Sequence, residues 1–538
     1  MGIYLNSTAP FEAYKIVASD RYFVDKSMLL EELIPSIDRE QRFLCITRPR
    51  RFGKTVMANM VAAYFGKASD SGSVFGRLEI AQSSRYKEYI NQYDIIYIDF
   101  SRLPENCHTY EEYINRIKTG IKEDLFDEFS ELALREDMSL WDIFSTIFQK
   151  TNRKFMFVMD EWDAVFHMPF VSPGERQEYL LFLKNLLKDQ VYVALTYMTG
   201  ILPIAKYSAA SELNMFVEYN MATRERFSSY FGFSDEEVDV LYQVYRDITP
   251  KPRITRQDLR IWYDGYCTAS GEQLYNPRSI ICALSDNQLG SYWTGSGPYD
   301  EIFYYIKGNI DKVRDDFILM ISGERIEARI QEYAATAEQL TTRNEIYSAM
   351  VIYGLLTYED GEVFIPNREL MYKYDELLLT NENLGYVYRL ARESERMLKA
   401  TLTGDTQIMS EILEYAHNTE SPILSYNSEI ELSAVVNLVY LSARDKYRIE
   451  REDKAGKGYV DFIFYPEKRN APAIILELKA DASPEEAIQQ IKDKQYILRL
   501  KGKLGEESKY TGKVLLVGIN YNKESKIHTC KVECVDKQ

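Results

Sequence analysis

The segment Ala-Ile-Ile-Leu-Glu-Leu-Lys, residues 473–479, decides how the C-terminal part of this chain is interpreted. Side chains alternate between the two faces of a strand, so Glu477 and Lys479 point to one side while the leucines beside them face the core. A second strand-like run, residues 458–464, carries Asp461. Two carboxylates and a lysine are typical of a site that holds Mg²⁺ and hydrolyses a phosphodiester. The sequence therefore predicts Asp461, Glu477 and Lys479 as catalytic residues, with both acids as ligands of Mg²⁺ or Mn²⁺.

A Glu-x-Lys pair is, by itself, more typical of the solvated edge of a sheet. Its surroundings favour a buried site instead. Glu477 follows four apolar residues, and Asp461 lies between apolar neighbours, although acids are depleted inside strands. A buried carboxylate needs a metal or another cation to offset its lost solvation. A metal site is thus the favoured interpretation.

Near the N-terminus, the strand-like run 43–47 leads through a turn to Lys54-Thr55 and a helical pattern. Strand, turn, Gly-Lys-Thr and helix follow one another as in a P-loop. The backbone N–H groups of the turn would surround phosphates, Lys54 would reach the β and γ oxygens, and Thr55 would ligate Mg²⁺. However, Arg48 replaces the usual first glycine. Gly-Lys-Thr alone is equally typical of an ordinary turn with a threonine at the helix N-cap.

Residues 154–161 form an apolar run that ends in two acids. A Walker B strand requires this pattern: Asp160 would hold Mg²⁺ through water, and Glu161 would polarise the attacking water as a catalytic residue. Thr199 ends another apolar run, where it is either a sensor of the γ-phosphate or a plain β-branched strand residue. The two motifs together favour ATP binding over an ordinary turn. The expected cofactor-binding residues are Arg48, Pro49, Arg50, Arg51, Phe52, Gly53, Lys54, Thr55, Asp160 and Thr199.

The order of the C-terminal elements carries further information. A helical pattern at 428–442 precedes Asp461, and another at 484–500 follows Lys479. Helix, strand, hairpin to Asp, strand with Glu-x-Lys and helix together resemble the core of the PD-(D/E)XK nuclease superfamily.

This resemblance implies that a glutamate of the first helix joins the metal site, either Glu429 or Glu431, with Glu429 preferred and Glu431 kept as a supporting residue. It also implies that a Gln–Tyr pair on the later helix, here Gln490 and Tyr496, supports the site. Leu432-Ser433 stand where the family often has Tyr-His. That departure leaves the contribution of the first helix open.

Motifs spread over most of the chain resemble the bacterial AAA-ATPase-like family. They are Tyr22–Lys26, Thr47–Thr55, Trp262–Tyr266, Tyr275–Pro277 and Tyr292–Trp293. An arginine at position 48 is that family's own pattern. Because its members commonly carry a C-terminal PD-(D/E)XK nuclease domain, the resemblance implies an ATPase joined to a nuclease.

We expect an α/β protein in which a P-loop NTPase parallel sheet, with a helical lid and a winged-helix region, precedes a restriction-endonuclease-like α/β domain. Apolar runs at 94–100 and 191–200, separated by helical patterns, indicate the parallel sheet. Asp360-Gly361 predicts a β-hairpin that resembles a wing. Gly295–Pro298 marks a break in the pattern. The predicted domains are 1–224 (ATPase core), 225–289 (lid), 290–425 (helical and winged-helix linker) and 426–538 (nuclease).

Composition is that of a multidomain cytoplasmic protein. The 538 residues exceed what one hydrophobic core supports. Six scattered cysteines show no paired framework and are expected to be reduced. No apolar run approaches the length of a membrane span, so no membrane partner is expected.

Charge is distributed unevenly along the chain. The whole chain has a net charge of −17, whereas residues 426–538 contain 20 Lys and Arg against 18 Asp and Glu. A basic surface beside a metal site suits a nucleic-acid partner, with DNA preferred over RNA, because phosphate contacts supply most non-specific affinity. A solvated helix face is an equally good explanation from charge alone. The basic residues are Lys492, Lys494, Arg499, Lys501, Lys503, Lys509 and Lys513.

The leading hypothesis is that ATP binding or hydrolysis gates a metal-dependent nuclease, a pairing that would suit defence against foreign DNA. In a first alternative, the protein is an ATP-driven regulatory switch whose nuclease-like domain binds nucleic acid without cleaving it. In a second, the P-loop senses nucleotide without turnover and the nuclease acts alone. A homo-oligomer is left open.

Overall fold

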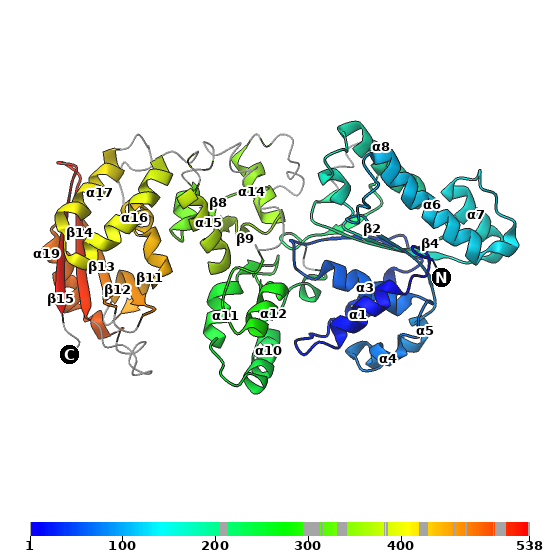
Figure 1. Cartoon of the computed structure of the whole chain (residues 1–538), viewed down its shortest axis with the longest axis horizontal. Helices are drawn as coiled ribbons and strands as arrows, with labels where there is room; N and C mark the ends of the chain where they lie inside the picture. Colours follow the sequence, from blue (N-terminus) through cyan, green and yellow to red (C-terminus); the bar gives the residue numbers. More distant parts are fainter. Residues whose placement is uncertain are drawn as a thin grey trace. The chain divides into compact units, whose positions relative to one another are not determined.

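The computed structural model describes residues 2–204, 213–224, 226–293, 313, 316–330, 340, 342–380, 382, 386–418, 429–455, 458–468, 471–498, 500 and 513–535. Within these ranges the side chains of 386–387, 417–418, 429–431, 452–455 and 458–459 are not described. The chain divides into two compact units (Figure 1). Unit 1 comprises Met1–Tyr305 and Glu327–Leu370, and unit 2 comprises Ile306–Ile326 and Met371–Gln538. The four-domain division stays a prediction.

The strands of unit 1 are β1 (Phe43–Thr47), β2 (Asp94–Asp99), β3 (Phe155–Asp160), β4 (Val193–Gly200), β5 (Val217–Tyr219), β6 (Tyr266–Cys267), β7 (Gln273–Leu274), β9 (Thr357–Glu359) and β10 (Glu362–Phe364). Its helices are α1 (Ala9–Ala18), α2 (Leu29–Leu33), α3 (Lys54–Phe65), α4 (Gly72–Phe75), α5 (Tyr86–Tyr89), α6 (Tyr110–Glu128), α7 (Leu140–Thr151), α8 (Pro173–Leu187), α10 (Asp235–Ile248), α11 (Arg256–Tyr263), α12 (Pro277–Asp286) and α14 (Arg343–Ile352). Strand β8 (Ile326–Glu327) and helix α15 (Arg368–Thr380) span the boundary between the units.

A five-stranded sheet forms the centre of unit 1, in the order β2-β3-β4-β1-β5. All four pairings are parallel, as the sequence predicts. In Figure 1, α1 and α3 lie below this sheet and α8 lies above it. The buried strands read as continuous apolar runs because helices cover both faces of a parallel sheet. This order brings the ends of β1, β3 and β4 together, which is where the nucleotide motifs lie.

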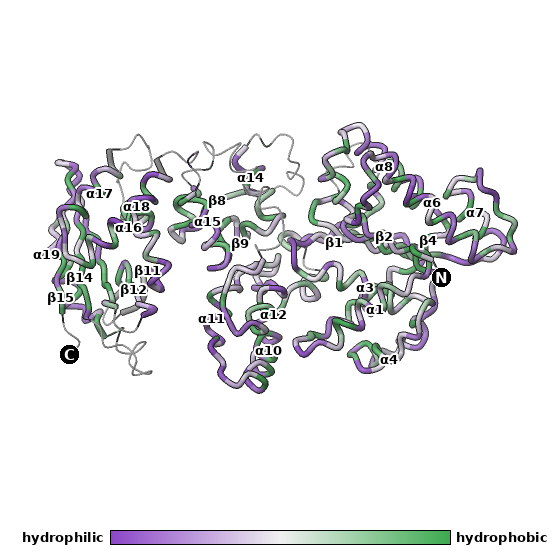
Figure 2. Tube along the Cα trace, viewed as in Figure 1, coloured by the Kyte–Doolittle hydropathy of each residue, from purple (hydrophilic) through white to green (hydrophobic). Residues whose placement is uncertain are grey.

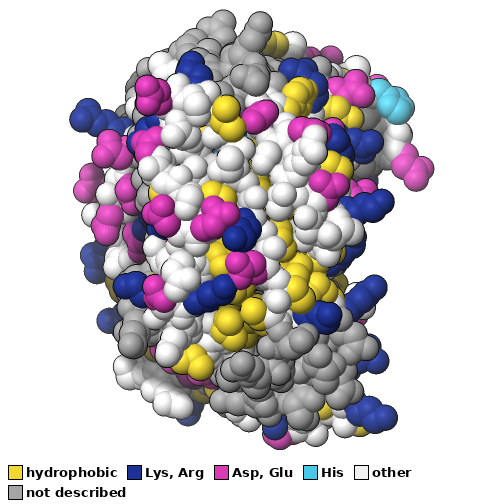
Figure 3. Space-filling model, turned by 90° about the vertical axis from the view of Figure 1, so that its left-hand side faces the viewer, with side chains coloured by type: hydrophobic (Ala, Val, Ile, Leu, Met, Phe, Trp, Pro, Cys, Tyr) yellow, Lys and Arg dark blue, Asp and Glu magenta, His cyan; other side chains and the backbone are white. Residues whose placement is uncertain are grey.

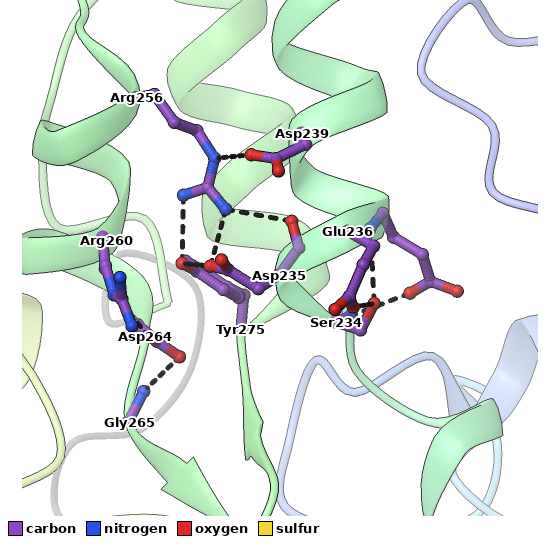
Figure 4. A network of polar contacts seen from close by, with 10 residues as sticks. Ser234, Asp235, Glu236, Asp239, Arg256, Arg260, Asp264, Gly265 and Tyr275 are labelled. Carbon is purple, nitrogen blue, oxygen red and sulfur yellow. Dashed lines mark hydrogen bonds and ion pairs between the residues drawn. The ribbon is translucent and has the colours of Figure 1, made fainter.

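Helices α10, α11 and α12 pack around a separate apolar core, which Tyr22 from the N-terminal segment joins. Arg256 at the start of α11 holds this segment together (Figure 4). Its guanidinium bonds the carboxylates of Asp235 and Asp239 on α10, each at 2.6 Å, and the hydroxyl of Tyr275 at 3.0 Å. The bonds therefore fix α10 and α11 to the segment that precedes α12.

The predicted hairpin at Asp360-Gly361 is confirmed. Strands β9 and β10 pair antiparallel, and both turn residues have positive φ, 50° and 90°. This is the geometry that a two-residue hairpin loop of the Asp-Gly type requires. The predicted break at Gly295–Pro298 lies outside the described residues.

The strands of unit 2 are β11 (Tyr447–Ala455), β12 (Gly458–Pro466), β13 (Ala473–Ala480), β14 (Val514–Asn522) and β15 (Ile527–Val535). Its helices are α16 (Tyr386–Thr403), α17 (Thr406–Asn418), α18 (Glu429–Val439) and α19 (Pro484–Asp493). The strands form one sheet in sequence order, with β13 parallel to β14 and the other neighbours antiparallel. The β14 tube is largely green, that is hydrophobic, in Figure 2.

Helices cover both faces of this second sheet. On one face, Arg451 bonds Ser433 of α18 at 2.9 Å and lies over the ring of Phe462. On the other, Ile463 and Ile475 share a core with residues of α19. The leucines beside Glu477 are buried as predicted, but Glu477 is also buried, because α19 covers its face of the sheet.

The predicted helix at 484–500 is interrupted in the structure by a turn at 494–496. Helix α19 ends at Asp493, and Gln495 takes the left-handed conformation with φ of 56°. The backbone N–H of Tyr496 then bonds the carbonyl of Ile491 at 3.1 Å, which is the closure of a Schellman motif. Tyr496 therefore lies in the turn after α19 and not on the helix.

Candidate functional sites

The loop between β1 and α3 has the conformation of a phosphate-binding turn. Gly53 precedes α3 with φ of 87°, and Arg51 also has a positive φ of 70°. No atom lies within 4 Å of where a Cβ of Gly53 would stand. Glycine is therefore favoured here by the positive φ and not by a lack of space for a side chain. The N-terminus of α3 consequently opens on the loop, as the sequence predicts.

Lys54 closes this loop from the inside. Its ammonium donates to the carbonyls of Arg48 at 2.9 Å and Pro49 at 3.0 Å. Burial lowers the pKa of Lys54, and the carboxylates of Glu161 and Asp163 oppose that shift. A buried ammonium within reach of the loop is a cation placed for phosphate oxygens.

Thr55, Asp160 and Thr199 meet beside this loop. The hydroxyls of Thr199 and Thr55 both donate to the carboxylate of Asp160. Burial raises the pKa of Asp160, and these two hydrogen bonds oppose the shift. A hydroxyl and a carboxylate in contact are the ligand pair that holds Mg²⁺ in P-loop enzymes.

Glu161 stands directly after β3 with φ of 49°, so the chain turns sharply at this residue. Burial raises the pKa of Glu161, and Lys54 opposes that shift. The next residue, Trp162, is fixed in place, because its backbone N–H donates to the carbonyl of Thr199 at 3.0 Å. The predicted catalytic acid thus occupies a defined position next to Asp160 and Lys54.

Arg48 was expected among the cofactor-binding residues, but its side chain serves the scaffold. It is only 1% exposed and donates to the carbonyls of Thr47 and Tyr219, both at 2.8 Å. Its guanidinium lies 4.9 Å from the ring centre of Phe231. Where the usual motif has glycine, this arginine ties the end of β1 to β5, and only its backbone faces the loop.

The second candidate site lies where β12 and β13 part. The ladder between these strands ends at the pair Phe462–Leu476, and the next pair in the same register is Asp461 and Glu477. Beyond this point the backbone N–H of Leu478 donates to the side-chain carboxylate of Asp461 at 2.6 Å. The two predicted acids are therefore cross-strand neighbours on one face, the face that α19 covers.

Glu477 is only 3% exposed. Its Oε1 accepts from Gln490 and lies 3.6 Å from the ammonium of Lys479. Its Oε2 is buried without a hydrogen-bond partner among the described residues. Burial, and next the charge of Asp461, raises the pKa of Glu477 to about 8, while Lys479 opposes this. A bound cation would offset the loss of solvation of this buried carboxylate.

Gln490 connects the site to its support. Besides bonding Glu477, its amide lies 3.5 Å from the hydroxyl of Tyr496. Close approach of α19 depends on Gly518 of β14, because a Cβ there would stand 2.2 Å from the carbonyl oxygen of Pro484. The predicted Gln–Tyr pair thus adjoins Glu477, although Tyr496 reaches it from the turn.

Comparison with known families places both sites in context. The family model described as a predicted AAA-ATPase matches residues 10–210, and the PD-(D/E)XK nuclease superfamily model matches residues 433–529. The chain thus has a segment similar to a predicted AAA-ATPase followed by a segment similar to the PD-(D/E)XK nuclease superfamily. The architecture expected from the sequence is confirmed.

Two solved structures share a distant likeness. The Walker-type ATPase of Pyrococcus abyssi is 14% identical with a TM-score of 0.35, and the match covers 65% of this chain and 94% of that one. The ORC2 protein of Aeropyrum pernix, solved as ADPNP–ADP complexes, is 10% identical with a TM-score of 0.32, covering 68% and 93%. A comparison with curated proteins found no match.

The donor set of the nuclease-superfamily domain fits a divalent cation in part. Two carboxylates face each other, and one of their oxygens is an orphaned buried acceptor, which a hard cation would satisfy. Among the described residues, however, no group of three or more His, Cys, Asp or Glu has metal-binding geometry. Glu429 and Glu431 begin α18, and their side chains lie outside the described residues. Their predicted part in the site stays a prediction.

The predicted basic surface is only partly described, because Arg499, Lys501, Lys503 and Lys509 lie outside the described residues. Of the others, Lys492 pairs with Glu533. Figure 3 shows Lys and Arg side chains intermixed with Asp and Glu on the face that it displays. No helix among the described residues is long and apolar enough to cross a membrane.

Sequence reasoning missed the residues that cover the P-loop. Trp293 Nε1 and Asn276 Nδ2 both donate to the carbonyl of Arg50, at 3.0 and 3.4 Å. Glu369 in turn accepts from the backbone N–H of Trp293 at 2.6 Å and from the hydroxyl of Ser279 at 2.7 Å. The family motifs contain Asn276 and Trp293 but give no contact for them. For Glu369 the sequence holds no signal.

Proposed function

We propose that the ATPase-like domain binds and hydrolyses ATP with Mg²⁺, and that its nucleotide state gates a metal-dependent nuclease in the C-terminal domain. In the first domain, Lys54 and the loop backbone would hold the phosphates, and Thr55 and Asp160 would hold the cation. Glu161 would orient and deprotonate the attacking water. Thr199 would report the γ-phosphate through its bond to Asp160.

In the nuclease-superfamily domain, Asp461 and Glu477 would hold Mg²⁺ or Mn²⁺. The bound cation would supply a Lewis acid for the scissile phosphate. Lys479, 3.6 Å from Glu477, is placed to neutralise charge that develops on that phosphate. Gln490 would hold Glu477 in position from α19.

The observation that carries the nuclease proposal is Oε2 of Glu477, which is buried beside Asp461 and Lys479 and has no hydrogen-bond partner among the described residues. In a purely structural strand, a carboxylate desolvated to this degree is a burden on the fold. A cation shared with Asp461 removes that burden. Nucleic acid is then the expected substrate, with DNA preferred, and defence against foreign DNA the role that this pairing of domains would suit.

Cleavage assays test the nuclease proposal. Wild type should cut at least one of single-stranded DNA, duplex DNA and RNA with Mg²⁺ or Mn²⁺. Asp461→Ala and Lys479→Ala should each lose at least about a hundredfold in rate. Glu485→Gln, which changes an exposed carboxylate at the start of the same α19, is the matched control and should keep the wild-type rate. Equal rates in all four proteins would contradict the assignment.

A regulatory switch without cleavage is the second candidate. It is favoured by the presence of only two carboxylates at the described site, where a third ligand would strengthen metal binding. Binding of nucleic acid by wild type, with no cleavage under any metal or nucleotide condition, would support this candidate against the first.

A further inference from the structure

A cleft of about 850 Å³ lies in the ATPase-like domain away from the nucleotide motifs, between α6, α8 and the start of α7. These helices stand together at the right of Figure 1, and α6 is mostly purple or pale, that is hydrophilic, in Figure 2. Neither the nucleotide site nor the nuclease-like site uses it. Its lining is both basic and aromatic.

Four lysines line the cleft against two acids, Glu178 and Asp189. The lysines are Lys118 and Lys122 of α6 and Lys184 and Lys188 at the end of α8. Lysines near the C-terminus of a helix have a local explanation in the helix dipole, but Lys118 and Lys122 stand in the middle of α6. In a chain of net charge −17, a net positive cleft is a local exception.

Within the described part of the chain, Lys118 and Lys122 form no ion pair. Lys118 Nζ stands 5.2 Å from the ring centre of Phe182, and Lys122 Nζ reaches only the carbonyl of Glu136 at 3.4 Å. Burial lowers the pKa of Lys118, and the nearby carboxylate of Glu178 opposes that shift. Half-buried ammonium groups that form no ion pair can still accept an anionic occupant.

The aromatic part of the lining is held ready for contact. Trp141 is 47% exposed, yet its Nε1 donates to the amide oxygen of Gln190 at 2.8 Å. Leu181 beside it is 44% exposed. An indole that is fixed at its edge and open to solvent is a platform on which a planar group can stack.

We propose that this cleft binds single-stranded nucleic acid, with its phosphates on the lysines and a base on Trp141. Lysines for the backbone and an aromatic platform for the bases are the two components of sequence-tolerant single-strand binding. Lys118 and Lys122 are one helical turn apart, about 6 Å along the axis, so they meet neighbouring positions of an extended strand. The inference rests on the proposed function in that nucleic acid is the partner, and it adds a binding surface outside the nuclease domain.

The cleft is also connected to the nucleotide motifs. The hydroxyl of Tyr179 on α8 donates to the carbonyl of Trp162 at 2.8 Å, directly after Glu161. The ring of Tyr179 packs edge-on against Phe100, which follows β2, at 5.3 Å between ring centres. If a bound nucleic-acid strand shifts α8, the contact between Tyr179 and Trp162 can transmit that shift to the turn that carries Glu161.

Fluorescence anisotropy with a labelled oligothymidylate and the full chain in EDTA tests the proposal, because cleavage is then suppressed. Lys118→Glu combined with Lys122→Glu should weaken binding at least about tenfold and lower the slope of log K against log salt by about 0.7 per lost contact. Trp141→Ala should weaken binding about tenfold, and Trp141→Phe should restore most of it. Lys87→Glu combined with Lys251→Glu, the same charge change on exposed lysines outside the cleft, should leave binding nearly unchanged.

Wild-type binding that neither set of cleft variants reduces below the control would overturn the inference while leaving the proposed nuclease intact. Displacement of the oligonucleotide by polyglutamate at equal charge would also overturn it, because the occupant would then be an acidic peptide. If wild type binds no oligonucleotide, this inference fails, whereas the proposed nuclease is judged separately by the metal-dependent cleavage assays. Unchanged binding of an ATP analogue verifies that each variant is folded.

Discussion

At the scale of single residues, this chain places carboxyl groups where water does not reach them. Glu477 and Glu369 are both buried, and burial raises the pKa of each, to about 8 and about 7. Glu369 has two hydrogen-bond donors, whereas Oε2 of Glu477 has none among the described residues. The first residue is thus explained as part of the P-loop cover, and the second only by a ligand.

Glu369 is expected to make the stability of unit 1 depend on pH. Its folded-state pKa lies above the unfolded value, so its contribution is fully present below the unfolded pKa of about 4.3 and is lost as pH rises through about 7. Relative to Glu369→Gln, wild type should lose up to about 3 kcal/mol in free energy of unfolding between about pH 5 and pH 8. This loss is measured as a fall in the melting temperature of wild type. Glu376→Gln on the exposed side of α15 is the control. Parallel curves for wild type and Glu369→Gln would contradict the assignment.

At the scale of elements, strands were easier to predict than the ends and contacts of helices. The runs at 43–47 and 473–479 are recognisable as strands by their apolar composition, and the alternation of side chains puts Glu477 and Lys479 on one face. The end of α19 could not be predicted, because Gln495 adopts a left-handed conformation that its residue type does not specify. The residues that cover the P-loop could not be predicted either, since Trp293 and Arg50 are more than 240 residues apart in sequence.

Packing of α19 against β14 is what brings Gln490 to Glu477. Gly518→Ala would place a Cβ 2.2 Å from the carbonyl oxygen of Pro484, and backbone cannot yield as a side-chain tip can. The nuclease-superfamily domain should lose about 2 kcal/mol of stability in urea unfolding. Metal-dependent cleavage should fall as well, because Gln490 moves away from Glu477. An unchanged urea midpoint would show that α19 is not packed in this way.

At the scale of the whole molecule, the chain combines two units with separate sites, and gating requires that nucleotide favour one of two arrangements. Glu161→Gln should bind ATP but lose about a hundredfold or more of its hydrolysis. With saturating ATP, its cleavage rate should therefore differ from that of wild type, whereas without nucleotide the two rates should agree. If neither protein's cleavage responds to ATP, the nuclease acts alone and the P-loop has another use.

If Asp461 and Glu477 share one divalent cation, Mn²⁺ should bind at this pair, and electron paramagnetic resonance measures that binding. Without nucleotide, at a pH above the Glu477 pKa of about 8, wild type and the control Glu485→Gln should bind one tight Mn²⁺. Affinity should fall toward tenfold per pH unit at lower pH, because the cation displaces the proton of Glu477. Asp461→Asn and Glu477→Gln should both abolish this site. An unchanged tight site in either variant would contradict the account.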